Sequence, residues 1–169
     1  MSGINNAIEN RLKAVRQDAR FRPAIDQVKA ANRQGVTSNE LLDVAVKATV
    51  DEYKASGRRL NADEVRERAF LAAAAAAVET PIHLADLPQG DDKTKHFFVS
   101  GLISIKIAEV ADKVLPRSWS EKLGTGASIF IGWGKEVYDK FFATGYNRDD
   151  LKADVAGAKR PFDLQVPGK

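Results

Sequence analysis

The residues best suited to chemistry surround one of the two histidines in the chain. Asp92 lies four residues before His96, and Ser100 lies four residues after it. Residues four apart share a face of an α-helix, so a helix here would bring a carboxylate, an imidazole and a hydroxyl together. A carboxylate one turn away can orient an imidazole and raise its pKa. His83, in contrast, lies in a proline-containing stretch and is interpreted as an ordinary loop residue.

Two acidic pairs further along the chain also have helical spacing. Glu136 and Asp139 are three residues apart, and Asp150 and Asp154 are four apart. If the three helical faces converge, they place one histidine and up to five carboxylates around a common centre, with a lysine for charge balance. The complete candidate site contains Asp92, Lys93, His96, Ser100, Lys135, Glu136, Asp139, Asp150 and Asp154.

Three interpretations of these residues are open from the sequence. In the first, the aspartates near helix starts are favoured by the helix dipole and the other carboxylates are solvated. In the second, the residues form a buried structural network of hydrogen bonds and salt bridges. In the third, His96, Glu136, Asp139 and Asp154 bind a divalent ion such as Mn²⁺, Fe²⁺, Zn²⁺ or Mg²⁺ and activate water. No cofactor is predicted, and a divalent metal is the one that these residue types allow.

Known nucleotide-binding motifs do not fit the chain. The stretch "GWGKE" ends like a phosphate-binding loop, but Ile129 occupies the position of the first glycine and Glu136 replaces the hydroxyl residue that binds magnesium. The stretch "GTGASI" lacks the third glycine of the dinucleotide fingerprint, and no strand precedes it. Nucleotide binding is therefore not expected.

The chain also has no cysteine, which excludes disulfides, thiolate zinc sites and cysteine nucleophiles.

Two helix starts carry the strongest local signals. The stretches "VTSNEL" and "LNADEV" place Thr37 three residues before Glu40, and Asn61 three residues before Glu64. This is the pattern of a capping box, and the flanking apolar residues suit a hydrophobic staple. The two signals predict helices near 38–56 and 62–79. The second helix contains six consecutive alanines, whose small side chains favour close packing in the middle of a bundle.

Helical periodicity continues through the rest of the chain. A helix is predicted over about 92–114, and the glycines of "GTG" are interpreted as a break before the next helix. A last helix follows "TGYNRDD" and is expected to turn Leu151 and Val155 inward. No segment of useful length alternates with the period of a strand. The sequence therefore predicts an all-α fold, a helical bundle of about six to eight helices with no significant β-sheet.

A break in the pattern divides the chain. The stretch "TPIHLADLPQGDD" contains two prolines and a glycine, which mark a loop or linker. We predict an N-terminal helical part over 1–88 and a C-terminal helical unit over 89–158. The residues 159–169 show no periodicity and are expected to form a tail.

The C-terminal unit resembles the YfiM-like family of small bacterial envelope lipoproteins and, more distantly, VanZ-like helical proteins. The matching stretches are "DKTKHFFVSG", "GKEVYD" and "DDLKADVAGA", in the same order. The resemblance implies that the polar residues belong to one shared design, and it would suggest an envelope location. It does not cover residues 1–88 and implies no particular reaction. The chain shows no lipidation cysteine, so envelope anchoring is not carried over.

Composition and charge indicate which classes of partner are expected. Residues 1–88 hold 13 Lys+Arg against 12 Asp+Glu, and residues 89–169 hold 13 against 11, so neither half concentrates the positive charge of a nucleic-acid binder. The helix near 96–115 is apolar enough to consider a membrane surface, but Lys106, Glu109, Asp112 and Lys113 put both signs on its polar side. The N-terminal stretch has no apolar core of a secretory signal, so we expect a cytoplasmic protein.

The functional hypothesis from the sequence is a non-catalytic helical interaction or structural module. It rests on the lack of a complete catalytic motif and on the packing surfaces of the apolar helices. Its partner would be another protein or a second copy of the chain, and neither nucleic acid nor nucleotide. The alternative is a metal-binding protein or metal-dependent hydrolase that uses His96 with the Glu136, Asp139 and Asp154 carboxylates.

Overall fold

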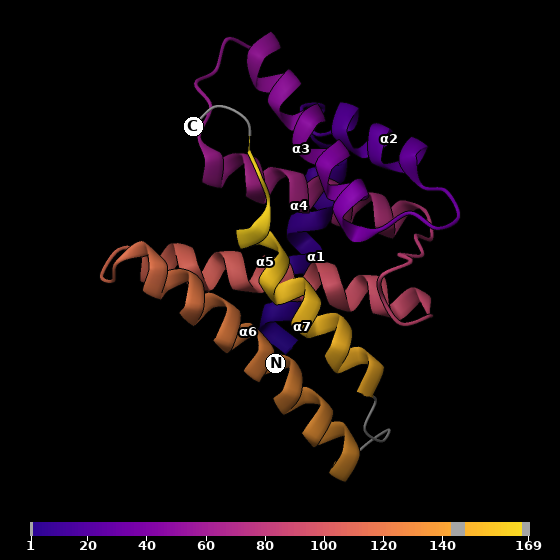
Figure 1. Ribbon diagram of the computed structural model, residues 1–169, viewed down its shortest axis with the longest axis vertical. Coiled ribbons are helices and arrows are strands. Elements are labelled where there is room, and N and C mark those ends of the chain that lie inside the picture. The colour runs from indigo at the N-terminus through magenta and orange to yellow at the C-terminus, as the bar shows by residue number, and fades with distance from the viewer. Residues whose placement is uncertain (1, 143–147, 167–169) are drawn as a thin grey trace. The chain divides into compact units, whose positions relative to one another are not determined.

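The computed structural model describes the backbone of residues 2–142 and 148–166, and the side chains of residues 8–90, 92–129 and 148–166. Within this part the chain forms seven α-helices and no strand, which confirms the predicted all-α class (Figure 1). The helices are α1 (Ser2–Gln17), α2 (Arg22–Ala31), α3 (Ser38–Ala55), α4 (Ala62–Glu79), α5 (Asp91–Ala111), α6 (Arg117–Phe142) and α7 (Arg148–Asp163).

The chain divides into two compact units. Unit 1 contains Met1–Ala85 together with Leu164–Lys169, and unit 2 contains Asp86–Asp163. The predicted tail is wrong in its first part, because α7 continues to Asp163. The reason is apolar burial: Ala158 and Pro161 are buried in unit 2. Leu164 is then buried in unit 1, where its carbonyl oxygen accepts a hydrogen bond from Arg66 Nε at 3.4 Å.

The two predicted helix starts are present, with different caps. Thr37 Oγ1 accepts the backbone N–H of Glu40 at 3.3 Å, and the Glu40 carboxylate accepts the backbone N–H of Thr37 at 2.9 Å, which is a complete capping box. Asn61 Oδ1 accepts the backbone N–H groups of Asp63 and Glu64. The Glu64 carboxylate, however, accepts a hydrogen bond from Arg58 at 2.6 Å. Local sequence thus specified where both helices begin. In the second helix Glu64 binds Arg58 of the preceding loop and does not complete a capping box.

Helix α4 lies at the centre of unit 1. It packs against α1, α2 and α3, and every residue from Arg68 to Ala77 is buried. A helix that is buried on all sides belongs to the interior of a core, and alanine allows its neighbours to approach closely. This confirms the packed interpretation of the alanine run. Large side chains from the surrounding helices, among them Ile25, Leu41 and Tyr53, are fully buried.

Unit 2 consists of α5, α6 and α7, and each of these helices packs against the other two. The break predicted at the "GTG" glycines is wrong, because α6 is continuous from Arg117 to Phe142. Gly124 faces α5: a Cβ at this position would collide with the carbonyl oxygen of Ser104 and lie 3.1 Å from the Ala108 side chain. The glycine therefore serves close helix packing and does not end the helix. Within the described residues, no helix combines the length and apolar character needed to cross a membrane.

Candidate functional site

The polar residues of unit 2 meet where α5 and α7 face each other. Helix α5 places Lys93, His96 and Ser100 on one face, at spacings of three and four. Helix α7 places Asp150 and Asp154 one turn apart on its buried face. Residues at these spacings lie above one another on a helix, so the two faces can meet along two turns. We call these five residues the α5–α7 network.

Each aspartate of α7 holds two groups of α5. Asp150 Oδ1 lies 2.5 Å from the Lys93 ammonium, and Asp150 Oδ2 lies 3.7 Å from His96 Nε2. Asp154 Oδ1 accepts a hydrogen bond from Ser100 Oγ at 2.6 Å and lies 3.1 Å from His96 Nδ1. Both ring nitrogens of the imidazole therefore face carboxylate oxygens. This geometry suits an imidazolium, which carries an N–H on each nitrogen.

The network is largely shielded from solvent. The exposed fractions of the side chains are 7% for Lys93, 12% for Asp150, 18% for His96 and 5% for Asp154. Burying a charge is costly unless the charge is paired and hydrogen-bonded. The alternation of cationic and anionic groups between the two helices meets that requirement. Removal of either aspartate takes a buried partner from two groups of α5.

Asp92 lies at the rim and acts on Lys93. Its side chain is 58% exposed, and its Oδ2 accepts a hydrogen bond from the Lys93 ammonium at 2.6 Å. This hydrogen bond holds the pKa of Asp92 below its usual value. Burial alone would lower the pKa of Lys93, but the hydrogen bonds to Asp150 and Asp92 outweigh it, so the pKa is raised and the group stays charged. The imidazole is positioned from α7, whereas the sequence pointed to Asp92 one turn away.

Backbone contacts bring the helices of unit 2 close together at the network. A Cβ on Gly157 would collide with the carbonyl oxygen of Phe97 and lie 2.8 Å from its Cα, so the glycine allows α7 to touch the backbone of α5. Helix α6 is tied to the same turn, because Ser128 Oγ donates a hydrogen bond to the carbonyl oxygen of Ser100 at 2.7 Å. Short distances between the polar groups follow from this close approach.

Three residues of the predicted site have no described side chain. The side chains of Lys135, Glu136 and Asp139 lie outside the described residues. Among the described residues, no three or more His, Cys, Asp or Glu side chains are arranged to hold a metal ion. His83, the other histidine, is an exposed residue between α4 and α5.

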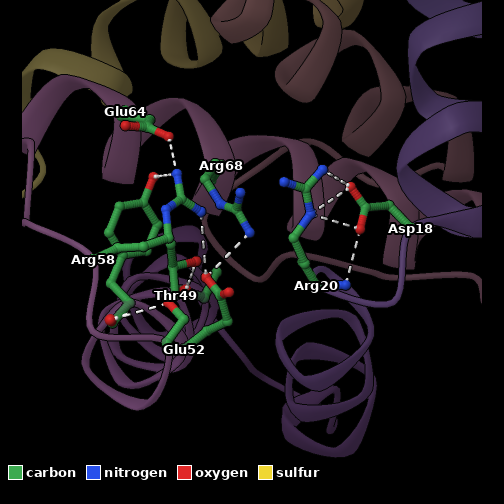
Figure 2. Close-up of polar contacts among 10 residues, drawn as sticks. Asp18, Arg20, Thr49, Glu52, Arg58, Glu64 and Arg68 are labelled. Carbon is green, nitrogen blue, oxygen red and sulfur yellow. Dashed lines mark hydrogen bonds and ion pairs between the residues drawn. The ribbon is translucent and has the colours of Figure 1, made fainter.

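A second polar cluster, which the sequence did not point to, lies in unit 1. It contains Glu52, Tyr53, Arg58, Glu64 and Arg68, and we call it the arginine cluster (Figure 2). The Arg68 guanidinium lies over the ring of Phe21 at 4.4 Å and near that of Tyr53 at 5.3 Å. It also donates to the Glu52 carboxylate at 3.3 Å. A guanidinium between two rings gains cation–π attraction in addition to its ion pair.

The second arginine of the cluster repeats this arrangement. The Arg58 guanidinium lies 4.2 Å from the centre of the Tyr53 ring and donates to the Glu64 carboxylate at 2.6 Å. Figure 2 shows Arg58 and Arg68 converging on Glu52, which lies 4.0 Å from Arg58 Nη1. Burial and the neighbouring Glu64 raise the pKa of Tyr53 to about 12. The tyrosine therefore stays neutral, and the arginines balance the carboxylates.

One sequence signal could have revealed this cluster. Arg68 lies three residues after Val65 and four residues before Ala72, and both of these are fully buried. An arginine on the apolar stripe of a helix must find a partner in the interior. The signal is the position of Arg68 in the heptad-like pattern, but it does not reveal that the partners are Glu52 and Tyr53 of α3 and Phe21 at the start of α2.

No family model matches the chain, and no curated protein or solved structure matches it. The functional argument therefore rests on the geometry of the residues.

Proposed function

We propose that unit 2 is a non-catalytic helical interaction module, in which the α5–α7 network fixes the packing of the helices and the α5–α6 turn presents an apolar surface to a partner. A cytoplasmic location is part of this proposal. The resemblance to the YfiM-like family is also part of the proposal. It is supported because two of its three stretches contain the members of the network: Lys93, His96, Ser100, Asp150 and Asp154.

One observation carries the proposal. Six large apolar side chains are exposed among the described residues, and five of them lie between residues 110 and 123. Apolar side chains that gather on the surface, in contrast to scattered ones, mark interaction sites. The five are Val110 (64% exposed), Val114 (81%), Leu115 (41%), Trp119 (65%) and Leu123 (48%), and we call them the tip patch.

The geometry of the network supports a structural role. A catalytic acid or base must reach a proton of its substrate, directly or through water. Here the Asp154 carboxylate is shared between Ser100 and His96, and Asp150 is shared between Lys93 and His96. The groups are used to hold α5 against α7.

The alternative is metal binding, which would use His96 and Asp154 together with further ligands, since the described residues alone form no group of three ligands. A metal ligand must offer a deprotonated imidazole nitrogen, and the Lys93 ammonium would compete for Asp150. Titration of the protein with Mn²⁺ and Zn²⁺, compared with an Asp154→Asn variant, tests this alternative. Micromolar binding that the substitution abolishes would favour the metal site over the structural network.

Photo-crosslinking tests the interaction module directly. A photoactivatable residue at Leu123, in cells that carry the protein, is expected to form adducts with a protein or lipid partner. The matched control places the same residue at Lys47, an exposed position on α3 of unit 1. Adducts at both positions, or at neither, would contradict the proposal.

A further inference from the structure

The tip patch surrounds the turn that joins α5 and α6. Trp119 and Leu123 are four residues apart on the first turns of α6 and share a face. Val110 lies at the end of α5, and Val114 and Leu115 follow in the turn, which is held by hydrogen bonds from their backbone N–H groups to the carbonyl oxygen of Ala111. Figure 1 shows this turn as the end of the α5–α6 hairpin. The patch therefore lies at the end of a helical hairpin (Figure 1).

The charges around the patch are distributed unevenly. Four cations and three carboxylates lie between residues 106 and 123. Glu109 pairs with Lys106 at 2.5 Å, and Arg117 pairs with both Asp112, at 2.8 Å, and Glu121, at 2.7 Å. Every carboxylate of this segment thus has a cationic partner within it, although Asp112 and Glu121 share a single arginine.

Two lysines are left over at the edge of the patch. No carboxylate among the described residues pairs with Lys113 or Lys122, and both residues are exposed. The Lys122 ammonium lies 5.9 Å from the centre of the Trp119 ring. The mixed charges of the segment argued against a membrane surface as long as only the sequence was considered. The acids are held by Lys106 and Arg117, so the cations without a carboxylate partner among the described residues are the two lysines, and the segment has a net charge of 4 − 3 = +1.

We propose that the tip patch docks on the surface of an anionic lipid bilayer, an inference that rests on the proposed interaction module and names its partner. Tryptophan prefers the boundary between lipid headgroups and acyl chains, and lysine can keep its ammonium among the headgroups while its stem lies on apolar surface. Unpaired lysines are attracted to anionic lipid by about 1 kcal/mol each. The exposed side chains at the end of a hairpin can insert into a fluid lipid surface, whereas a protein partner would need a matching hollow. The contact is peripheral: the tip inserts, and no helix within the described residues is long and apolar enough to span the bilayer.

Vesicle flotation with the full chain tests the proposal. We expect the protein to float with vesicles that contain about one third anionic phospholipid and to stay with the soluble fraction when the vesicles are purely zwitterionic. About 1 M salt, which shortens the screening length to about 3 Å, should weaken the binding. In a Trp133→Phe background Trp119 is the one remaining tryptophan. Its emission should shift to shorter wavelength on binding.

Paired variants separate the two parts of the patch. Trp119→Ser with Leu123→Ser removes apolar contact, and Lys113→Gln with Lys122→Gln removes the free charge; each pair should lower vesicle affinity about tenfold or more. The matched controls are Val78→Ser, the exposed apolar residue outside the patch, and Lys47→Gln with Lys54→Gln on α3, and these should bind like the unchanged protein.

Each remaining outcome has a definite meaning. Absence of flotation with anionic vesicles, or flotation that neither patch variant reduces, overturns the lipid inference. If a crosslinker at Leu123 then captures a protein, the interaction module stands with a different partner. If it captures nothing, the interaction module falls as well.

Discussion

The α5–α7 network and the arginine cluster stabilise their charged groups by different means. The α5–α7 network lies between two helical faces, and each group depends on one or two partners on the opposite helix. The arginine cluster draws on α3, α4 and the loop between them, and its guanidinium groups lie over aromatic rings as well as near carboxylates. Side chains in the first cluster have few alternatives, whereas those in the second have several.

This difference predicts how each cluster tolerates damage. Removal of one partner in a tight pair leaves an uncompensated buried group, which is strongly destabilising. A guanidinium over a ring keeps part of its attraction when one carboxylate is lost, and Glu52 keeps a second arginine when one is removed. We therefore expect single substitutions to lower the free energy of unfolding strongly in unit 2 and only moderately in unit 1.

The largest effect is expected for Asp154→Leu. The substitution leaves His96 and Ser100 without their shared acceptor and should lower the free energy of unfolding of unit 2 by about 3–4 kcal/mol. Native-state hydrogen exchange of the α5 and α7 amides would measure the change. Asp154→Asn keeps an acceptor oxygen and should cost only about 1–2 kcal/mol. If the leucine variant lowers the free energy of unfolding by less than about 1 kcal/mol, the network contributes no more than an exposed ion pair and the prediction is wrong.

The next effect tests the close approach that makes the network compact. Gly157→Ala places a methyl group against the backbone of Phe97, so α7 must move away, and we expect a loss of about 2–3 kcal/mol. Gly126→Ala is the matched control, because a Cβ there meets nothing within 4 Å. That change should stabilise α6 by about 0.5–1 kcal/mol. Thermal unfolding of both variants gives the comparison, and equal losses would contradict it.

A smaller effect is expected in the arginine cluster. Arg68→Leu removes the contacts to Phe21 and Glu52, but Glu52 retains Arg58, so the free energy of unfolding of unit 1 should fall by about 1–2 kcal/mol. Arg68→Lys keeps the charge and loses the flat stacking group, and should give an intermediate loss. Urea unfolding followed by exchange of α4 amides measures both. A loss larger than that of Asp154→Leu would reverse the proposed ranking of the clusters.

The smallest effect lies at the edge of unit 1. Hydrogen bonds from the Arg20 side chain and backbone lower the pKa of Asp18 from 3.8 to about 2. A lowered pKa in the folded state means that the ionised carboxylate stabilises the fold above pH 3.8, and that this contribution is lost as the pH falls toward 2. Asp18→Asn should therefore cost about 0.5–1 kcal/mol at neutral pH, and the difference should vanish near pH 2. Arg20→Gln should show the same pH dependence, and a difference that persists at pH 2 would exclude the ion pair as its cause.

The candidate site was partly accessible to sequence reasoning because helical spacing is a local property. Four-residue spacing placed Asp150 and Asp154 on one face, and both are buried there. The predicted inward face of α7 was wrong in part. Leu151 and Val155 were expected to face inward but are only half-buried, because the buried face carries Asp154 and Gly157. Apolar character was a poor guide here, because close helix contact favours small and paired polar residues over large apolar ones.

The same reasoning explains the face of α5. The sequence grouped Asp92 with His96 and Ser100, but the buried charged residue of the first turn is Lys93, and Asp92 is at the rim. One helical position separates the two choices, and both are charged. Only the position of α7 decides which of them is covered.

The sequence by itself determined that the chain forms helices, where α3 and α4 begin, and that α4 packs in a core, since caps, periodicity and small side chains act within a few residues. Tertiary structure decided the rest. It placed Gly124 and Gly157 at helix contacts, gathered the arginine cluster from separate segments, and brought the two aspartates of α7 to their partners on α5. These outcomes depend on distances between residues far apart in the chain, and such distances are set only when whole helices pack.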